Sequence, residues 1–245
     1  MPDRFYLPRP TPLQVGASIP LPEAEAHHIL RVLRMTDGAD LIIFDGHGDE
    51  YSATLEVLGK RGAAAKLLDC RQINRELPRA VHIWTAIPKG ERGAAMLEQL
   101  CELGAAAVHP LLLQRAVVKP AENTIDRYQR IVIAASKQCG RNILMQVHPA
   151  SNLANALTQC RPAESILLHP NPDAPELGAL LRDKLTQQAP CHLWIGPEGG
   201  CTPDELTQLT AHGMPCARFG ASILRIGTAA VAAMALARGL LGAVE

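Results

Sequence analysis

Residues 192–205 read HLWIGPEGGCTPDE, and this stretch predicts the fold of the second half of the chain. An apolar run predicts a buried strand, Gly196–Gly200 predicts a turn, and a helix start follows. Thr202 suits the N-cap, Pro203 suits the first helical position, and Glu205 completes a capping box. Ligands of open α/β sheets bind at such strand ends, although the turn alone also suits a connection without a ligand.

Two further strands are predicted to end in turns of small residues. Ser165–Leu168 runs into His169, and Cys216–Phe219 runs into a loop that ends at Arg225, before an alanine-rich helix. Arg225 lies between apolar residues, so its guanidinium is either buried against a carboxylate or directed at a ligand. Together with Gly196–Gly200, these strand ends predict the walls of one pocket.

Strands and helices alternate throughout the second half of the chain. Strands are expected at Val81–Ile87 and Ala106–His109, and helices at Glu91–Leu103 and Thr124–Gln138. This alternation predicts an α/β domain with a parallel sheet covered by helices. The dinucleotide fingerprint G-x-G-x-x-G and the phosphate loop G-x-x-x-x-G-K-[ST] are both absent from the sequence, which argues against a nucleotide-dependent metabolic enzyme.

The first part of the chain predicts a small β-rich domain. Strands are expected at Asp40–Phe44, Tyr51–Leu58 and Ala63–Leu68, and a helix at Pro22–Leu33, which suggests a small barrel or a half-open sheet. The polar stretch 70–79 is interpreted as a linker. We therefore expect two domains, residues 1–72 and residues 73–245.

Composition excludes several classes of protein. The 245 residues are 47% hydrophobic but only 3% aromatic, and 24 basic side chains balance 24 acidic ones, so the chain is not a uniformly basic nucleic-acid coat. Its seven cysteines lack C-x-x-C spacing, which argues against a disulfide framework and a structural metal site and favours the cytoplasm. The most apolar stretch, 228–244, is interrupted by Arg238 and is too short for a membrane span, and no signal peptide is evident.

Positive charge is concentrated in the middle of the chain. Residues 73–160 hold ten basic and six acidic side chains. Arg127, Arg130, Lys137 and Arg141 recur at intervals that place most of them on one side of a helix. This pattern predicts either a solvated helix face or a face that binds RNA phosphates.

Several motifs, spread over essentially the whole chain, carry a resemblance to a known family. They are Arg4-Phe5-Tyr6, residues 28–34 (HILRVLR), residues 89–92 (KGER), residues 97–104 (LEQLCELG), residues 137–141 (KQCGR), residues 195–200 (IGPEGG) and Ile223-Leu224-Arg225. With these motifs the chain resembles the 16S ribosomal RNA uracil-N3 methyltransferases, the RsmE type of the SPOUT superfamily.

The resemblance implies a SPOUT domain with a deep trefoil knot, a PUA-like RNA-binding domain, a homodimer, and S-adenosylmethionine as cofactor. It places the adenine among aliphatic side chains and backbone groups. The implied cofactor-binding residues are Leu168, His169, Ile195, Gly196, Gly199, Gly200, Gly220, Ile223, Leu224, Arg225 and Thr228. The implied RNA-binding residues are Arg4, Arg31, Arg34, Arg127, Arg130, Lys137 and Arg141.

The implied reaction is methyl transfer to N3 of a uridine in 16S ribosomal RNA of the small subunit. Arg225 is the expected catalytic residue, since a guanidinium can stabilise the uracil anion but cannot act as a base. Glu198 is expected to hold its loop. The family's usual Thr-Glu is replaced here by Ile226-Gly227, so no role is carried over for that Glu. A catalytically impaired RNA-binding or assembly factor, and a methyltransferase for another RNA, are the alternatives.

Overall fold

The computed structural model describes residues 2–8, 13–116 and 124–242. Contacts divide the chain into two compact units. The first holds the residues up to Arg75 together with Ser136–Leu144, and the second holds Glu76–Ala135 and the residues from Met145 onward. The segment Ser136–Leu144 joins the first unit through a bridge between Gly46 and Ile143 and a hydrogen bond from Arg75 to the Gly140 carbonyl.

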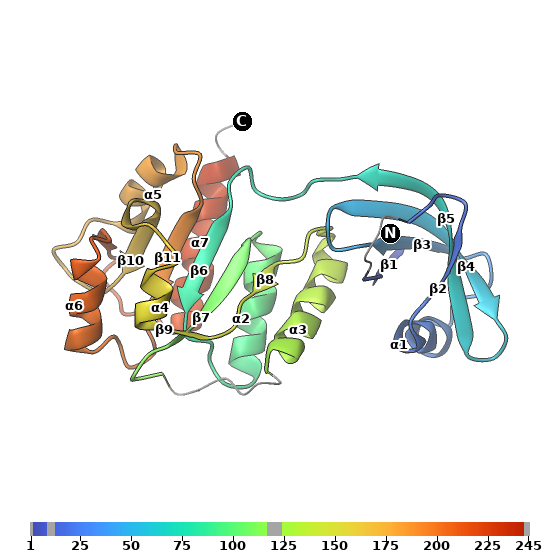
Figure 1. Cartoon of the computed structure of the whole chain (residues 1–245), viewed down its shortest axis with the longest axis horizontal. Coiled ribbons are helices and arrows are strands. Elements are labelled where there is room, and N and C mark those ends of the chain that lie inside the picture. Colours follow the sequence, from blue (N-terminus) through green and yellow to red (C-terminus); the bar gives the residue numbers. More distant parts are fainter. Residues whose placement is uncertain (1, 9–12, 117–123, 243–245) are drawn as a thin grey trace. The chain divides into compact units, whose positions relative to one another are not determined.

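The first unit is a five-stranded sheet with the order β1-β3-β4-β5-β2 (Figure 1). The central strands β3, β4 and β5 pair antiparallel, and β1 pairs parallel with β3. Its core is aliphatic with Phe5 and Tyr51 among the buried rings. The three predicted strands are confirmed, and the predicted linker is shorter than expected because β5 continues to Gln72. The strands are β1 (Asp3–Tyr6), β2 (Ser18–Pro20), β3 (Asp40–Phe44), β4 (Asp49–Leu58) and β5 (Gly62–Gln72).

The expected helix at Pro22–Leu33 divides into two kinds of helix. α1 (Glu23–His27) is followed by a π-helical turn, η1 (His28–Val32). π-helical turns are rare and frequently occur at functional sites. Arg34 then adopts a positive φ of 54°, which is uncommon for a residue with a side chain.

The second unit is built on a parallel sheet with the order β12-β10-β11-β6-β7-β8, and β9 pairs with β7 (Figure 1). All of its described pairings are parallel, which confirms the predicted sheet. Its strands are β6 (Val81–Thr85), β7 (Ala107–Leu112), β8 (Gln146–Val147), β9 (Ser151–Asn152), β10 (Ser165–Leu168), β11 (Cys191–Ile195) and β12 (Cys216–Ala217).

Helices cover both faces of this sheet, as Figure 1 shows. α7 packs against α2, α5, β6 and β11 on one side. On the other side, side chains of α4 and α6 join a core with Trp84 and Trp194. The helices are α2 (Glu91–Glu102), α3 (Thr124–Cys139), α4 (Leu153–Leu157), the 3-10 helix η2 (Pro162–Glu164), α5 (Leu177–Leu185), α6 (Pro203–Ala211) and α7 (Ile226–Gly242).

Candidate active site

Four loops meet at the carboxyl edge of the parallel sheet. Ile195 lies opposite Thr85 and Leu168, and Leu168 also lies opposite Ala217, so β6, β10, β11 and β12 end at the same level. The residues that follow these strands are therefore neighbours in space. Three of these loops are the ones that the sequence singles out, and the fourth follows β6.

The loop Gly196–Gly200 is fixed by the helix that it enters. The Thr202 hydroxyl accepts a hydrogen bond from the Glu205 amide at 3.2 Å, and Glu205 accepts one from the Thr202 amide at 2.8 Å, which confirms the predicted capping box. The other Glu205 oxygen accepts from the Gln114 amide at 2.7 Å, and Arg115 donates to the Gly199 carbonyl at 3.1 Å. Loop and helix start are thus tied to the segment after β7.

Glu198 does not hold this loop, contrary to the expectation from the sequence. Its side chain is exposed and makes no hydrogen bond or ion pair with the described residues. The anchoring is done by Glu205 and Arg115 instead. The Glu198 carboxylate is therefore available for contact with a ligand.

The loop between β12 and α7 is anchored by Glu176 at its start, and its end is exposed to solvent. Glu176 accepts a hydrogen bond from the Gly220 amide at 3.0 Å and pairs with Arg218 at 3.0 Å. Further along, Ile223 is 84% exposed, which is unusual for a large aliphatic side chain. Arg225 is also exposed, and within the described part of the chain its side chain has no polar partner, so it is not buried against a carboxylate.

A cavity of about 150 Å³ opens between the loops that follow β6 and β11. The first turn of α7 also reaches it, so the Gly196–Gly200 loop and the segment after Arg225 do lie side by side. Its walls combine apolar surface with three charged side chains. The lining residues are Ala86, Ile87, Pro88, Lys89, Arg92, Ala116, Pro197, Glu198 and Ile226.

The β6 loop lines this cavity although the sequence did not predict it there. Lys89 and Arg92 belong to a motif that directly follows a predicted strand, and this position was the available signal. Both side chains are exposed, and neither has a hydrogen bond or ion pair with another described residue. With Glu198 they place two cations and one carboxylate around the cavity.

The cofactor-binding residues predicted from the resemblance differ in accessibility. All belong to the strand ends, loops and helix start at this edge of the sheet. Leu168 and Ile195 are buried; His169, Gly196 and Leu224 are half-buried; Gly199, Gly200, Gly220, Ile223, Arg225 and Thr228 are exposed. None of them lines the 150 Å³ cavity, which is formed by their chain neighbours Pro197, Glu198 and Ile226.

Three of the predicted RNA-binding residues have internal partners. Arg4 pairs with Glu50 at 2.7 Å, and its side chain is only 9% exposed. Lys137 pairs with Glu25, and Arg141 is 4% exposed. α3 ends at Cys139, so Arg141 lies beyond the helix that carries Arg127 and Arg130, and Lys137 is paired with Glu25.

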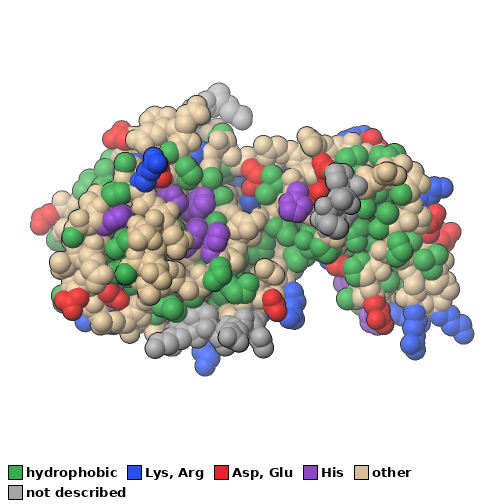
Figure 2. Space-filling view, in the orientation of Figure 1, with side chains coloured by type: hydrophobic (Ala, Val, Ile, Leu, Met, Phe, Trp, Pro, Cys, Tyr) green, Lys and Arg blue, Asp and Glu red, His purple; other side chains and the backbone are tan. Residues whose placement is uncertain are grey.

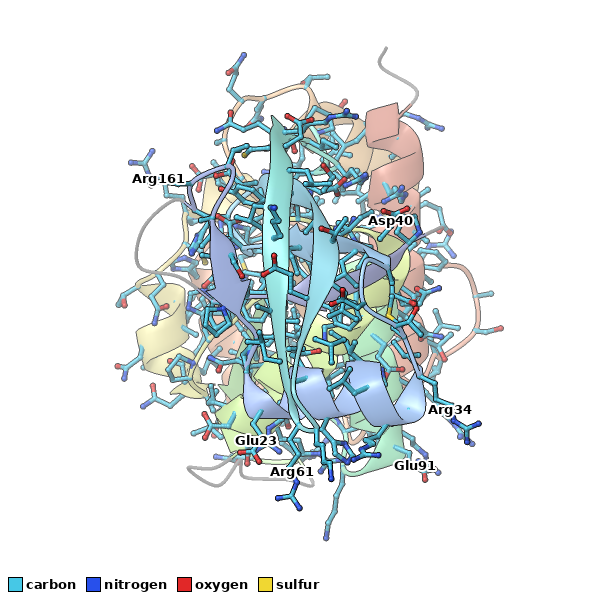
Figure 3. The ribbon with its side chains drawn as sticks, turned by 90° about the vertical axis from the view of Figure 1, so that its right-hand side faces the viewer. Glu23, Arg34, Asp40, Arg61, Glu91 and Arg161 are labelled. Carbon is cyan, nitrogen blue, oxygen red and sulfur yellow. The ribbon has the colours of Figure 1, made fainter. Side chains whose placement is uncertain are left out.

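Four of the predicted RNA-binding residues remain exposed. Arg31 and Arg34 lie in and just after η1, and Arg127 and Arg130 lie on α3. Figure 3 shows the side chain of Arg34 pointing away from the ribbon. Val32, between the first two, is 60% exposed, so this surface presents apolar as well as basic groups.

Four histidines and both tryptophans of the chain form a stacked cluster on one face of the parallel sheet. Trp84 stacks on Trp194 at 4.6 Å and on His109 at 3.9 Å between ring centroids, and it donates a hydrogen bond to His192 at 2.9 Å. His82 lies 3.0 Å from His109 between ring nitrogens. His148 stacks on the same His109 ring at 4.1 Å. Purple histidine side chains gather on this part of the surface in Figure 2.

Burial holds the buried histidines of this cluster in the neutral form. Burial, together with the nearby His148, lowers the pKa of His109 to about 3. Burial and the neighbouring His82 lower the pKa of His192 to about 4, although Glu164 lies 4.0 Å from its ring. Across the described residues no group of three or more His, Cys, Asp or Glu side chains is arranged to hold a metal ion.

The fold and the loops at this edge define a class of RNA-modifying enzyme. A family model described as RNA methyltransferase domain matches residues 75–238, and one described as RNA methyltransferase PUA domain matches residues 21–68. The ribosomal RNA small subunit methyltransferase E of Synechocystis is 33% identical over 229 residues, which cover 93% of this chain and 75% of that protein.

Two solved structures agree over nearly the whole chain. Ribosomal RNA small subunit methyltransferase E from Neisseria gonorrhoeae, bound to S-adenosyl methionine, is 32% identical with a TM-score of 0.87 and covers 98% of each chain. A Legionella pneumophila protein with the bound cofactor SAM is 29% identical with a TM-score of 0.87, covering 100% of this chain and 98% of that one. The chain therefore belongs to the ribosomal RNA small subunit methyltransferase E family.

None of the helices within the described ranges combines the length and apolar character that crossing a membrane requires.

Proposed function

We propose that this protein transfers a methyl group from S-adenosylmethionine to N3 of a uridine in 16S ribosomal RNA of the small subunit. The observation that carries the proposal is the meeting of the Gly196–Gly200 loop, the β12–α7 loop and the β6 loop at one edge of the sheet. Family membership and the cofactor in two similar solved structures support it.

The loops at this edge fit the proposed cofactor. Gly200 and Gly220 both have a φ of 70°, and a Cβ built on either would meet no atom within 4 Å, so their backbone is accessible to a ligand. The exposed Ile223 and half-exposed Leu224 offer apolar contacts for an adenine ring. We propose that these residues, with the other predicted cofactor-binding positions, hold S-adenosylmethionine.

The cofactor would supply an electrophilic methyl group. The protein must therefore align the acceptor nitrogen with that methyl group and favour the acceptor's negatively charged form. N3 lies on the Watson–Crick edge of uracil, which requires an unpaired or extruded base. When N3 loses its proton, negative charge spreads over both carbonyl oxygens. We assign Arg225 to stabilise that charge, because its guanidinium is exposed and has no partner among the described residues.

RNA binding is assigned to both domains, residues 1–72 as the PUA-like domain and residues 73–245 as the methyltransferase domain. Arg31, Arg34, Arg127 and Arg130 are the exposed candidates for phosphate contacts. Arg4, Lys137 and Arg141 are assigned structural roles instead. The deep trefoil knot stays a prediction.

We further propose that the protein is a cytoplasmic homodimer. Small side chains recur every three or four residues along α7 and are at least partly exposed: Thr228, Ala232, Ala235, Gly239 and Gly242. Such a stripe allows a second helix to approach closely, and the exposed Ile223 in the loop before α7 would be covered by it. Light scattering in solution measures the oligomeric state directly.

The test is mass spectrometry of nucleosides from small ribosomal subunits that lack the modification, after incubation with the protein and S-adenosylmethionine. The expected product is 3-methyluridine in 16S ribosomal RNA. Methylation of another nucleoside would show that the enzyme has a different target. Binding without any methyl transfer would support the impaired assembly factor, which the Ile226-Gly227 replacement makes the second candidate.

A further inference from the structure

The size of the cavity beside Glu198 matches one ring rather than a whole cofactor. Its volume of about 150 Å³ is at most about half of the roughly 300–1,000 Å³ of pockets that enclose drug-sized ligands. An engineered protein cavity of about that volume binds benzene, so it admits one six-membered ring. A pyrimidine base is such a ring.

The lining of the cavity suits a flat ring with a polar edge. Ala86, Ile87, Pro197 and Ile226 supply apolar walls, while Glu198 is the one carboxylate among the residues that line it. Its side chain is exposed and has no polar partner among the described residues, so no internal contact must be broken before it can meet a ligand.

We propose that this cavity holds the target uracil and that Glu198 removes the proton from N3, an inference that rests on the function proposed above. The N3–H proton passes to a carboxylate oxygen of Glu198, and the electron pair of that bond stays on N3. This pair forms the new bond to the methyl carbon as the carbon–sulfur bond breaks and its electrons return to sulfur. The products are 3-methyluracil, a neutral thioether and a protonated Glu198, which then releases its proton to water.

Two cations complete the arrangement. Lys89 and Arg92 line the same cavity and have no ion-pair partner within the described ranges. Each carries donors that can bind a phosphate oxygen of the target strand or a uracil carbonyl on which negative charge develops. Glu198 then acts as the general base, and Lys89, Arg92 and Arg225 stabilise the uracil anion.

The test compares Glu198→Gln with the wild-type protein across pH, using unmodified small subunits as substrate. General-base catalysis contributes about 100- to 10,000-fold, so the variant should lose at least about 100-fold in rate at pH 7. Its rate should then rise about tenfold per pH unit, because the deprotonated fraction of N3 in free uridine rises by that factor. Calorimetry should give an affinity for S-adenosylmethionine within about twofold of wild type. Asp204→Asn, an exposed acid in the first turn of α6 outside the cavity, is the matched control and should keep the wild-type rate.

A second variant tests the cavity without changing its charges. Ala116→Leu adds bulk to a half-buried wall position and should raise KM for the subunits at least about tenfold while affinity for S-adenosylmethionine stays unchanged. An Ala116→Leu protein with wild-type KM would overturn the placement of the target uracil in this cavity.

A Glu198→Gln protein within threefold of wild type at pH 7, or equally impaired at every pH, would overturn the role of Glu198. These outcomes differ from failure of the proposed function itself, in which the wild-type protein forms no 3-methyluridine at all.

Discussion

Acidification should destabilise the second unit through its buried histidines. His109 and His192 keep their neutral form in the fold because burial lowers their pKa to about 3 and about 4. In the unfolded chain both take up a proton near the ordinary histidine pKa of about 6.5. The stability that they contribute is therefore complete above pH 6.5 and is lost as the pH falls toward their folded values.

The size of this effect follows from proton linkage. Each proton bound only by the unfolded chain costs about 1.4 kcal/mol of stability per pH unit. From pH 6.5 to pH 4.5 His109 accounts for about 2.3 kcal/mol and His192 for about 2.2 kcal/mol, together about 4.5 kcal/mol. The pKa of His82 is also lowered by burial and acts in the same direction. Since domains are stable by roughly 5–15 kcal/mol, this loss is a large share of the total stability.

The chain provides its own probe for this transition. Trp84 and Trp194 are its two tryptophans, and both stack in the cluster, so urea unfolding followed by their fluorescence reports on this site. Between pH 6 and pH 5 the free energy of unfolding should fall by about 2.4 kcal/mol per pH unit from His109 and His192. His109→Gln should reduce this slope by about 1.2 kcal/mol per pH unit. A slope that His109→Gln does not change would show that protonation of His109 does not drive the acid destabilisation.

Three further outcomes test the proposed site and RNA surface. Arg225→Ala should lower the rate of methyl transfer at least about 100-fold with little change in calorimetric affinity for S-adenosylmethionine; equal loss of both would make it a binding residue. Gly199→Val should abolish that affinity. A Cβ at this position would lie 3.1 Å from the Arg115 side chain, so the larger valine must displace the loop that is proposed to bind the cofactor. Unchanged binding by calorimetry would contradict this placement of the cofactor. Reversing Arg127 and Arg130 to Glu should weaken RNA binding and flatten its dependence on salt; an unchanged slope would leave them as solvated surface residues.

The parts of the fold that the sequence predicts are those whose signals are local. The strand, turn and capped helix at residues 191–211 are specified by an apolar run, glycines, and the Thr202–Glu205 pair, and the structure contains each of them. The cavity is different because it depends on the order of strands in the sheet. β6 lies beside β11 although more than 100 residues separate them, and no local pattern encodes that pairing.

Charge patterns mislead for a related reason. The spacing of Lys137 and Arg141 predicts a shared face only while the helix continues, and α3 ends at Cys139, before a glycine with a φ of 84°. Arg141 is buried instead. Similarly, Arg4 is basic and near the start of the chain, but Glu50 pairs with it in the folded unit. Spacing in sequence therefore identifies candidates, and only the packing decides which of them face solvent.

The position of β11 between β10 and β6 explains why one loop serves two tasks in the proposed reaction. Since β11 lies between β10 and β6, the loop Gly196–Gly200 must lie between the loops that follow these two strands. Its glycines lie next to the proposed cofactor-binding strand ends, and Glu198 lines the cavity on the β6 side. In-line transfer requires donor and acceptor to be held in a fixed relation, and a misplacement of about 1 Å is costly. Because Glu205 and Arg115 anchor this single loop, the two binding regions share one rigid wall, and a change in that wall would disturb both together.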